Sequence, residues 1–281
     1  MAAVLALLSS VWWGSADFLG GTLSRRHRAT LVVGYSQAAG LVSIGVVAAV
    51  AGAYGDDPAY LPWAVLSGVA GVIGLVCFYA ALAAGTMGVV SPIAALGVVV
   101  PVLAGLARGE RPGALQLVGI VVAVAGVVLA SGPELSGRAG VRPLLLAGIA
   151  AVGFGVALLA IAEGARTSTL MTLVSMRLTS VTLLAAALVV ALARGMSRSE
   201  LAVGRRDGAL IAAVGVGDVA ANLSFGIAST RGLVSVVAVL GSLYPVVTVL
   251  LARVLHGERL GRLQTTGVAA ALAGVALIAL G

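Results

Sequence analysis

Three ionisable side chains, Asp17, Arg177 and Asp218, lie well inside long apolar stretches of this sequence. A charge at the centre of a membrane-spanning helix costs about 2.5 to 3.5 kcal/mol on insertion scales, so each of these groups needs a partner, a cavity or a role. Buried carboxylates bind protons or cations, whereas a buried arginine neutralises a carboxylate or binds an anion. We therefore predict that Asp17 and Asp218 are charge or proton partners and that Arg177 is their countercharge or an anion ligand.

Amide and phenol side chains extend this candidate site. Asn222 lies one helical turn after Asp218 and therefore shares its face of a helix. Gln37 aligns close to Arg177 when the two halves of the chain are compared, so both halves offer a polar group at related positions. Five aromatic residues are suited to line a pocket or stack on a substrate: Trp12, Trp13, Tyr35, Tyr79 and Tyr244. The predicted substrate-binding or coupling residues are Asp17, Gln37, Tyr79, Arg177, Asp218, Asn222 and Tyr244.

Several of these residues also have a purely structural interpretation. Arg177 and Asp218 could only fasten two neighbouring helices together. Asp17 could extend toward the arginines that begin at Arg25, near the membrane surface. Each of the five aromatic residues could instead belong to the core or face lipid. Glu110 and Glu258, which precede apolar stretches, are interpreted as charges at the N-termini of helices.

The sequence does not indicate a metal site, a disulfide bond or a nucleic-acid-binding surface. Cys77 is the single cysteine, and the two histidines, His27 and His256, both lie in loops, so no metal site and no other cofactor is predicted. The net charge of +7 comes from arginines. They lie at the ends of apolar stretches and not among interleaved aromatics, which argues against a nucleic-acid partner. The expected partners are a small-molecule substrate and the lipid bilayer.

The composition predicts an all-α integral membrane protein. Of 281 residues, 60% are hydrophobic and 10% are charged, and the mean hydropathy is +1.15. Charge-poor windows of about 20 residues recur along the chain, which is the length that an α-helix needs to cross about 30 Å of hydrocarbon. The ten predicted transmembrane helices lie at about residues 3–23, 30–53, 61–84, 88–107, 113–131, 142–163, 168–193, 208–229, 233–256 and 261–280.

The sequence contains an internal duplication. Gly109-Glu110-Arg111 and the small residues that follow it return 148 residues later, as Gly257-Glu258-Arg259. A second stretch returns 144 residues later and pairs Pro101 with Pro245, each of which must break a helix hydrogen bond. The predicted domains are two five-helix repeats, residues 1–135 and 140–281. Because five is odd, the second repeat is inverted, and inverted repeats place a substrate site near mid-membrane at their interface.

The arginines predict how the ten helices are oriented. Arginines in the loops after odd-numbered helices outnumber those after even-numbered helices, and cytoplasmic loops carry the excess of basic residues. The positive-inside rule therefore puts both termini outside the cell, in what we expect to be the plasma membrane.

Four short motifs carry a resemblance to a known family: Trp13-Gly14-Ser15, Phe78-Tyr79-Ala80-Ala81-Leu82, Pro101 and Gly109-Glu110-Arg111. Together they resemble the EamA family of the drug/metabolite transporter superfamily, over nearly the whole chain. The resemblance implies ten helices, a duplicated five-helix unit and efflux or uptake of small metabolites such as amino acids, sugars or drugs. It also implies cytoplasmic termini, in contrast to the arginine distribution.

The residues and the resemblance together predict a multi-pass secondary transporter and not an enzyme. It would move a small metabolite or drug by alternating access, as a proton-coupled carrier or an exchanger, and act as a monomer or homodimer. The alternative is an intramembrane aspartyl protease, because Gly215-Val216-Gly217-Asp218 matches the Gly-x-Gly-Asp string of that class. Such a protease needs two aspartates that share a proton, and the surroundings of Asp17 do not match the partner motif.

Overall fold

The protein is built from α-helices. Its computed structural model describes residues 1–84, 87–130, 141–256 and 261–280, and these ranges contain helices and no strand. The α-helices are α1 (Ala2–Ser24), α2 (Ala29–Val50), α3 (Leu61–Ala84), α4 (Met87–Ala95), α5 (Val99–Ala107), α6 (Ala114–Ala130), α7 (Val141–Ala193), α8 (Arg205–Ser229), α9 (Val234–Gly241), α10 (Tyr244–His256) and α11 (Arg262–Leu280). The short 3₁₀ helices are η1 (Ala53–Gly55), η2 (Pro58–Tyr60), η3 (Leu96–Val98) and η4 (Arg198–Leu201). The expected all-α fold is confirmed.

Helices of two lengths make up the bundle. Within the described ranges, five helical segments are long and apolar enough to cross a membrane: α1, α2, Pro58–Ala84, α7 and α8. The shorter apolar helices lie at Ile93–Ala107, Ala114–Gly126, Val234–Thr248 and Thr265–Ile278. The ten predicted spans are therefore not each a single long helix.

Two of the predicted spans are interrupted close to a proline. Helices α4 and α5 are separated by η3, which contains Gly97, and α9 ends at Gly241, before α10 begins. Pro101 and Pro245 have no N–H with which to bond the carbonyl four residues earlier, and that carbonyl belongs to Gly97 or Gly241. The same covalent cause thus interrupts the equivalent helix in both halves of the chain.

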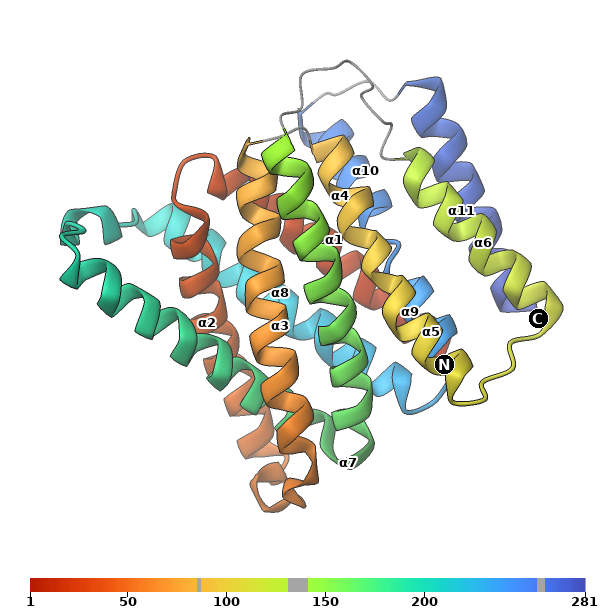
Figure 1. The fold of residues 1–281 in the computed structure, drawn as a ribbon, viewed down its shortest axis with the longest axis horizontal. Coiled ribbons are helices and arrows are strands. Elements are labelled where there is room, and N and C mark those ends of the chain that lie inside the picture. Colours follow the sequence, from red (N-terminus) through yellow and green to blue (C-terminus); the bar gives the residue numbers. More distant parts are fainter. Residues whose placement is uncertain (85–86, 131–140, 257–260, 281) are drawn as a thin grey trace.

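The long helix α7 turns back on itself at Ser168. This residue has extended dihedral angles, φ −153° and ψ 112°, inside an otherwise helical run. Its side-chain oxygen accepts a hydrogen bond from the backbone N–H of Met171 at 3.2 Å, as the oxygen of an N-cap residue does. Figure 1 shows the chain reversing direction in α7. The predicted spans 142–163 and 168–193 are therefore two parts of α7, and no loop separates them.

Helices from the two halves of the chain pack against each other. Helix α3 packs along α7, α1 packs against α8, and α6 packs against α11, a pair that lies at one edge of the bundle in Figure 1. Small residues allow the close approach of α6 and α11. A Cβ at Gly119 would lie 2.8 Å from the carbonyl oxygen of Gly274 and from Cγ1 of Ile278. Because these helix pairs join the two halves, residues of both halves surround the centre of the bundle.

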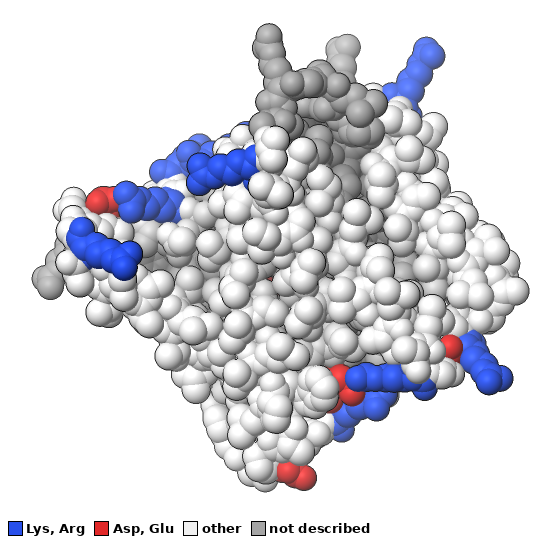
Figure 2. Space-filling view, viewed as in Figure 1, with Lys and Arg blue, Asp and Glu red and all other residues white. Residues whose placement is uncertain are grey.

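Charged side chains gather at the edges of the molecule. Figure 2 shows arginine and acidic side chains along two edges, with a broad band of uncharged side chains between them. Large apolar side chains such as Val42, Val121 and Val152 are exposed. This pattern is the one expected when the outer faces of the helices contact lipid and their ends contact water.

Candidate functional site

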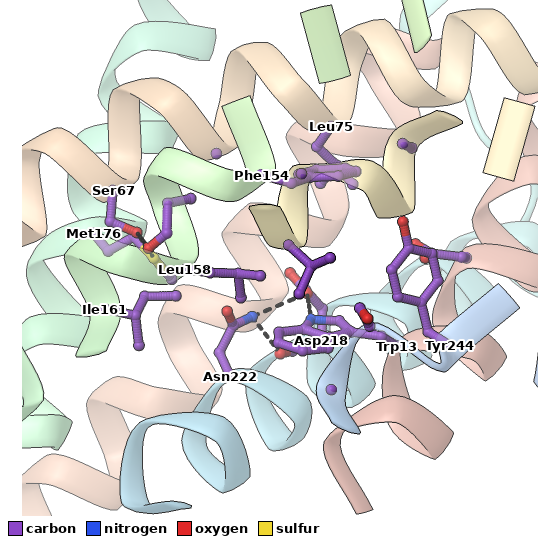
Figure 3. Close-up of a pocket in the computed structure, with 18 of the residues that line it drawn as sticks. Trp13, Ser67, Leu75, Phe154, Leu158, Ile161, Met176, Asp218, Asn222 and Tyr244 are labelled. Atoms are coloured by element: carbon purple, nitrogen blue, oxygen red, sulfur yellow. Dashed lines mark hydrogen bonds between the residues drawn. The ribbon is translucent and has the colours of Figure 1, made fainter. Parts of the chain in front are cut away.

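A cavity lies among helices of both halves. Helices α1, α2, α3 and α4 contribute residues from the first half, and α7, α8 and α10 contribute residues from the second. Figure 3 shows Trp13, Asp218 and Asn222 on one side, with Leu75 and Phe154 across from them. The cavity therefore has a polar wall and an apolar wall.

The polar wall is centred on a buried ion pair. Arg177 Nη2 lies 2.7 Å from Asp218 Oδ2, and Arg177 Nη1 donates a hydrogen bond to Gln37 Oε1 at 2.6 Å. Gln37 Nε2 in turn donates to Asp218 Oδ2 at 3.4 Å. Arg177 is only 3% exposed, so its charge is neutralised by Asp218 where water is scarce. The structure thus brings together three groups that the sequence places in three separate helices.

The second oxygen of Asp218 is also engaged. Trp13 Nε1 donates to Oδ1 at 3.1 Å, and Asn222 Nδ2 donates to the same oxygen at 3.0 Å and to the Asp218 carbonyl at 2.6 Å. The carboxylate thus has polar partners on α1, α2, α7 and α8. Its orientation is fixed by groups from both halves of the chain.

Glycines set the helix spacing that lets these side chains meet. A Cβ at Gly215 of α8 would collide with the carbonyl of the residue before Gln37 in α2. A Cβ at Gly68 of α3 would lie 2.7 Å from the carbonyl of the residue before Arg177 in α7. In each contact, a glycine of one half packs on the residue just before a candidate site residue of the other half. Gln37 and Arg177 therefore occupy equivalent positions and meet at the centre of the molecule.

Asp17 lines the same cavity but does not belong to the ion-pair network. The residue is 8% exposed. In the described part of the chain it has no hydrogen-bond or salt-bridge partner. It does not extend to the arginines near Arg25, which was the structural alternative. One acidic side chain at the cavity is thus without a counterion.

The two candidate tyrosines lie in different places. Tyr244 lines the cavity, and its buried hydroxyl has no hydrogen-bond partner within the residues that the structure describes. Tyr79 is 1% exposed, and its ring packs against Gly20 of α1, outside the cavity lining. The structure therefore brings Tyr244 to the candidate site and places Tyr79 in the core.

Two further aromatic residues line the cavity: Trp13, one of the five aromatic residues suited to a pocket, and Phe154, which was not predicted. Trp13 precedes Gly14, which packs on α10 of the second half. Phe154 precedes Gly155, which packs on η3 of the first half. A Cβ at Gly14 would lie 2.6 Å from a carbonyl of α10, and one at Gly155 would collide with a carbonyl of η3. The repeated aromatic-glycine dipeptide is the sequence signal from which both aromatic residues could be found.

Glu110 caps a different helix from the one expected. Its Oε1 accepts a hydrogen bond from Val234 N at 2.7 Å. Its Oε2 accepts from Ser235 N at 3.0 Å and from Ser235 Oγ at 2.7 Å. A carboxylate in this position satisfies free N–H groups at the start of α9 and complements the helix dipole. The contact ties a turn of the first half to a helix of the second, whereas Glu258, the repeat equivalent, lies outside the described residues.

The geometry does not support the protease alternative. An aspartyl protease needs two carboxylates that share a proton. Asp218 instead pairs with Arg177, and no hydrogen bond joins it to Asp17 in the described structure. Within the same residues, no group of three or more His, Cys, Asp or Glu side chains could hold a metal ion.

Comparisons with known proteins agree with this duplicated helical architecture. The model of the EamA-like transporter family matches residues 1–132 and 141–280. A solved structure described as "Crystal structure of protein" is 21% identical, with a TM-score of 0.78, over 99% of this chain and 96% of that chain. At this identity the likeness concerns the fold alone. No curated protein matches the chain.

Proposed function

This chain belongs to the EamA-like transporter family, and we propose that it is a secondary transporter that carries a small molecule through the cavity between its halves. The observation that carries the proposal is the polar network at that cavity. Gln37 and Trp13 of the first half bond to Arg177 and Asp218 of the second, so a movement of the halves must remake these bonds. The site of action is the plasma membrane, and the protein acts as a monomer or homodimer.

We further propose ten spans arranged as two inverted repeats, residues 1–135 and 140–281, that give alternating access. The packing of α1 on α8 is matched by that of α3 on the first part of α7, around Gly153. Gln37 and Arg177 are equivalent in the two halves and touch each other. Such contacts are expected on a pseudo-two-fold axis, about which the halves can rock.

Glu110 supplies a contact that closes one end of this assembly. Three hydrogen bonds and a helix N-terminus hold its carboxylate against Val234 and Ser235. Because the two partners belong to different halves, rocking that opens this end must break the contact. Glu110 therefore serves as a latch between the halves.

The substitution Glu110→Gln is expected to increase the time that this end spends open. The amide turns an NH₂ group toward N–H and O–H donors, so at least one of the three hydrogen bonds is lost together with the charge. A hydrogen bond to a charged group contributes about 1.5–3 kcal/mol, so the open fraction should rise about tenfold or more. Labelling of a Ser242→Cys reporter in a Cys77→Ser background, with a membrane-impermeant maleimide added from the Glu110 side, measures this fraction.

A matched control for the latch is Asp57→Asn. Asp57 also caps a helix, but it bonds only Ala59 N, within its own loop. Labelling should be unchanged in this variant. Equal labelling of the Glu110→Gln variant and the parent protein would contradict the latch.

Flux measurements test the proposed function itself. Purified protein in proteoliposomes should move at least one solute from a panel of amino acids, sugars and organic amines. Dependence on a pH gradient would indicate proton coupling, and dependence on internal solute would indicate exchange. The transporter proposal fails if no solute of the panel shows protein-dependent flux under any gradient.

A further inference from the structure

The cavity lining contains more acidic than basic side chains. Its charged side chains, within the described ranges, are Asp17, Arg177 and Asp218. Arg177 and Asp218 neutralise each other across 2.7 Å, which leaves Asp17. The cavity lining therefore has one carboxyl group more than it has basic groups.

The two aspartates of the cavity are in opposite situations. Asp218 is bonded by Trp13, Gln37 and Asn222 in addition to its ion pair. Asp17 has no such partner in the part of the chain that the structure describes. An ionised carboxyl group without a partner in a cavity of low dielectric constant is costly, and either a proton or a bound cation offsets that cost. A cationic group of the ligand would thus supply the partner that this position lacks.

The surroundings of Asp17 suit an ammonium group. Tyr244 lines the same cavity as Asp17, and its buried hydroxyl oxygen is not engaged by any described residue. A primary ammonium has three N–H donors, so it can bond a carboxylate and a hydroxyl oxygen together. Trp13 and Phe154 line the same cavity, and aromatic ring faces attract cations within about 6 Å.

The remainder of the cavity suits an apolar body. Leu75 and Phe154 lie across from Asn222 in Figure 3, and Leu158 lines the same cavity. A mostly apolar lining with a few polar groups is typical of a small-molecule site. An anionic ligand fits poorly, because the charge of Arg177 is already balanced by Asp218 at 2.7 Å.

We propose that the cavity selects a small amphipathic amine in its protonated form, and that Asp17 binds its ammonium group. This inference rests on the proposed transport function and deepens it by naming the substrate class. It assigns recognition of the substrate's charge to Asp17. Arg177 and Asp218 then join the two halves of the protein and do not bind the ammonium.

Calorimetric titration of the purified protein in nanodiscs tests the substrate class. The probes are 2-phenylethylamine, hexylamine and tryptamine, each compared with the alcohol and the carboxylate of the same carbon skeleton. At least one amine should bind about tenfold or more tightly than its alcohol, since a charge-assisted hydrogen bond contributes about 1.5–3 kcal/mol. The proposal is overturned if no amine binds, or if alcohols or carboxylates bind as tightly as the amines.

Variants of Asp17 test the residue. Asp17→Asn keeps the side-chain size and removes the charge, so the advantage of the amine over its alcohol should disappear while the alcohol binds as before. Asp17→Glu keeps the charge and should keep the preference. Asp56→Asn, which changes an exposed carboxylate after α2, should behave as the parent protein. An amine preference that survives in Asp17→Asn would show that the ammonium binds elsewhere.

Failure of this inference is distinguishable from failure of the proposed function. Binding is measured without flux, and the flux panel contains solutes that are not amines. Flux of a sugar without amine binding would refute the substrate class and support transport. Amine binding through Asp17 without flux of any solute would support the assignment of Asp17 and contradict the transport proposal.

Discussion

Transport is expected to be lost when Arg177 is replaced by methionine. The substitution keeps an apolar stem of similar length, but it leaves Asp218 without its ion-pair partner and Gln37 Oε1 without its donor. Removal of one member of a buried ion pair costs about 3–5 kcal/mol. We therefore expect no measurable flux in proteoliposomes and a lower melting temperature of the detergent-solubilised protein.

A double variant separates the functional role of this ion pair from a purely structural one. Arg177→Met combined with Asp218→Asn leaves no uncompensated charge at these two positions, so the melting temperature should return close to that of the parent protein. Flux should remain absent, because Gln37 and Trp13 of the first half lose the charged partners that join them to the second. Recovery of flux together with stability would mean that the pair only fastens α7 to α8.

The second large effect is expected from Gly215→Ala. A Cβ at this position would collide with the backbone carbonyl of Ser36, which cannot move aside as a flexible side chain can. Helices α2 and α8 must therefore separate, and Gln37, the next residue of α2, must move with them. Overpacking of this kind costs about 1–3 kcal/mol. We expect a lower melting temperature and reduced flux, measured as for the Arg177 variant.

Gly208→Ala is the matched control for this prediction. Gly208 lies two turns earlier on the same helix, and a Cβ there would have no atom within 4 Å. Alanine is a better helix former than glycine by about 1 kcal/mol, so this variant should be as stable as the parent protein or slightly more stable. Equal destabilisation by both substitutions would show that the contact between α2 and α8 does not set the helix spacing.

The helical pattern was readable from the sequence because it depends on local properties. The described α-helices lie in the apolar windows. Pro101 and Pro245 lie within one turn of the interruptions that they cause. The reversal in α7 is different. Window lengths predict a short connection before residue 168, whereas the structure has helix up to Ser168. One extended residue that caps the next helix is sufficient to turn the chain.

The candidate site was predictable only in part. The cost of burying a charge drew attention to Asp17, Arg177 and Asp218, and all three line one cavity. The indole N–H of Trp13 gave no comparable signal, because an indole at a membrane surface can bond to water or lipid as well as to protein. Tyr79 shows the opposite difficulty. An aromatic residue in an apolar helix has the same local pattern whether it faces a cavity or the core.

By itself the sequence determined a duplicated, helical membrane protein with three charges inside its apolar stretches. Span length and the cost of burying a charge follow from residues that are close together in the chain, and the duplication follows from a comparison of the two halves. Only the tertiary structure decided that Arg177 pairs with Asp218 while Asp17 is left without a counterion. The physical reason is that side-chain pairing depends on distances of a few ångström between helices. Those distances are set by contacts such as Gly215 on α2, which join residues far apart in the chain.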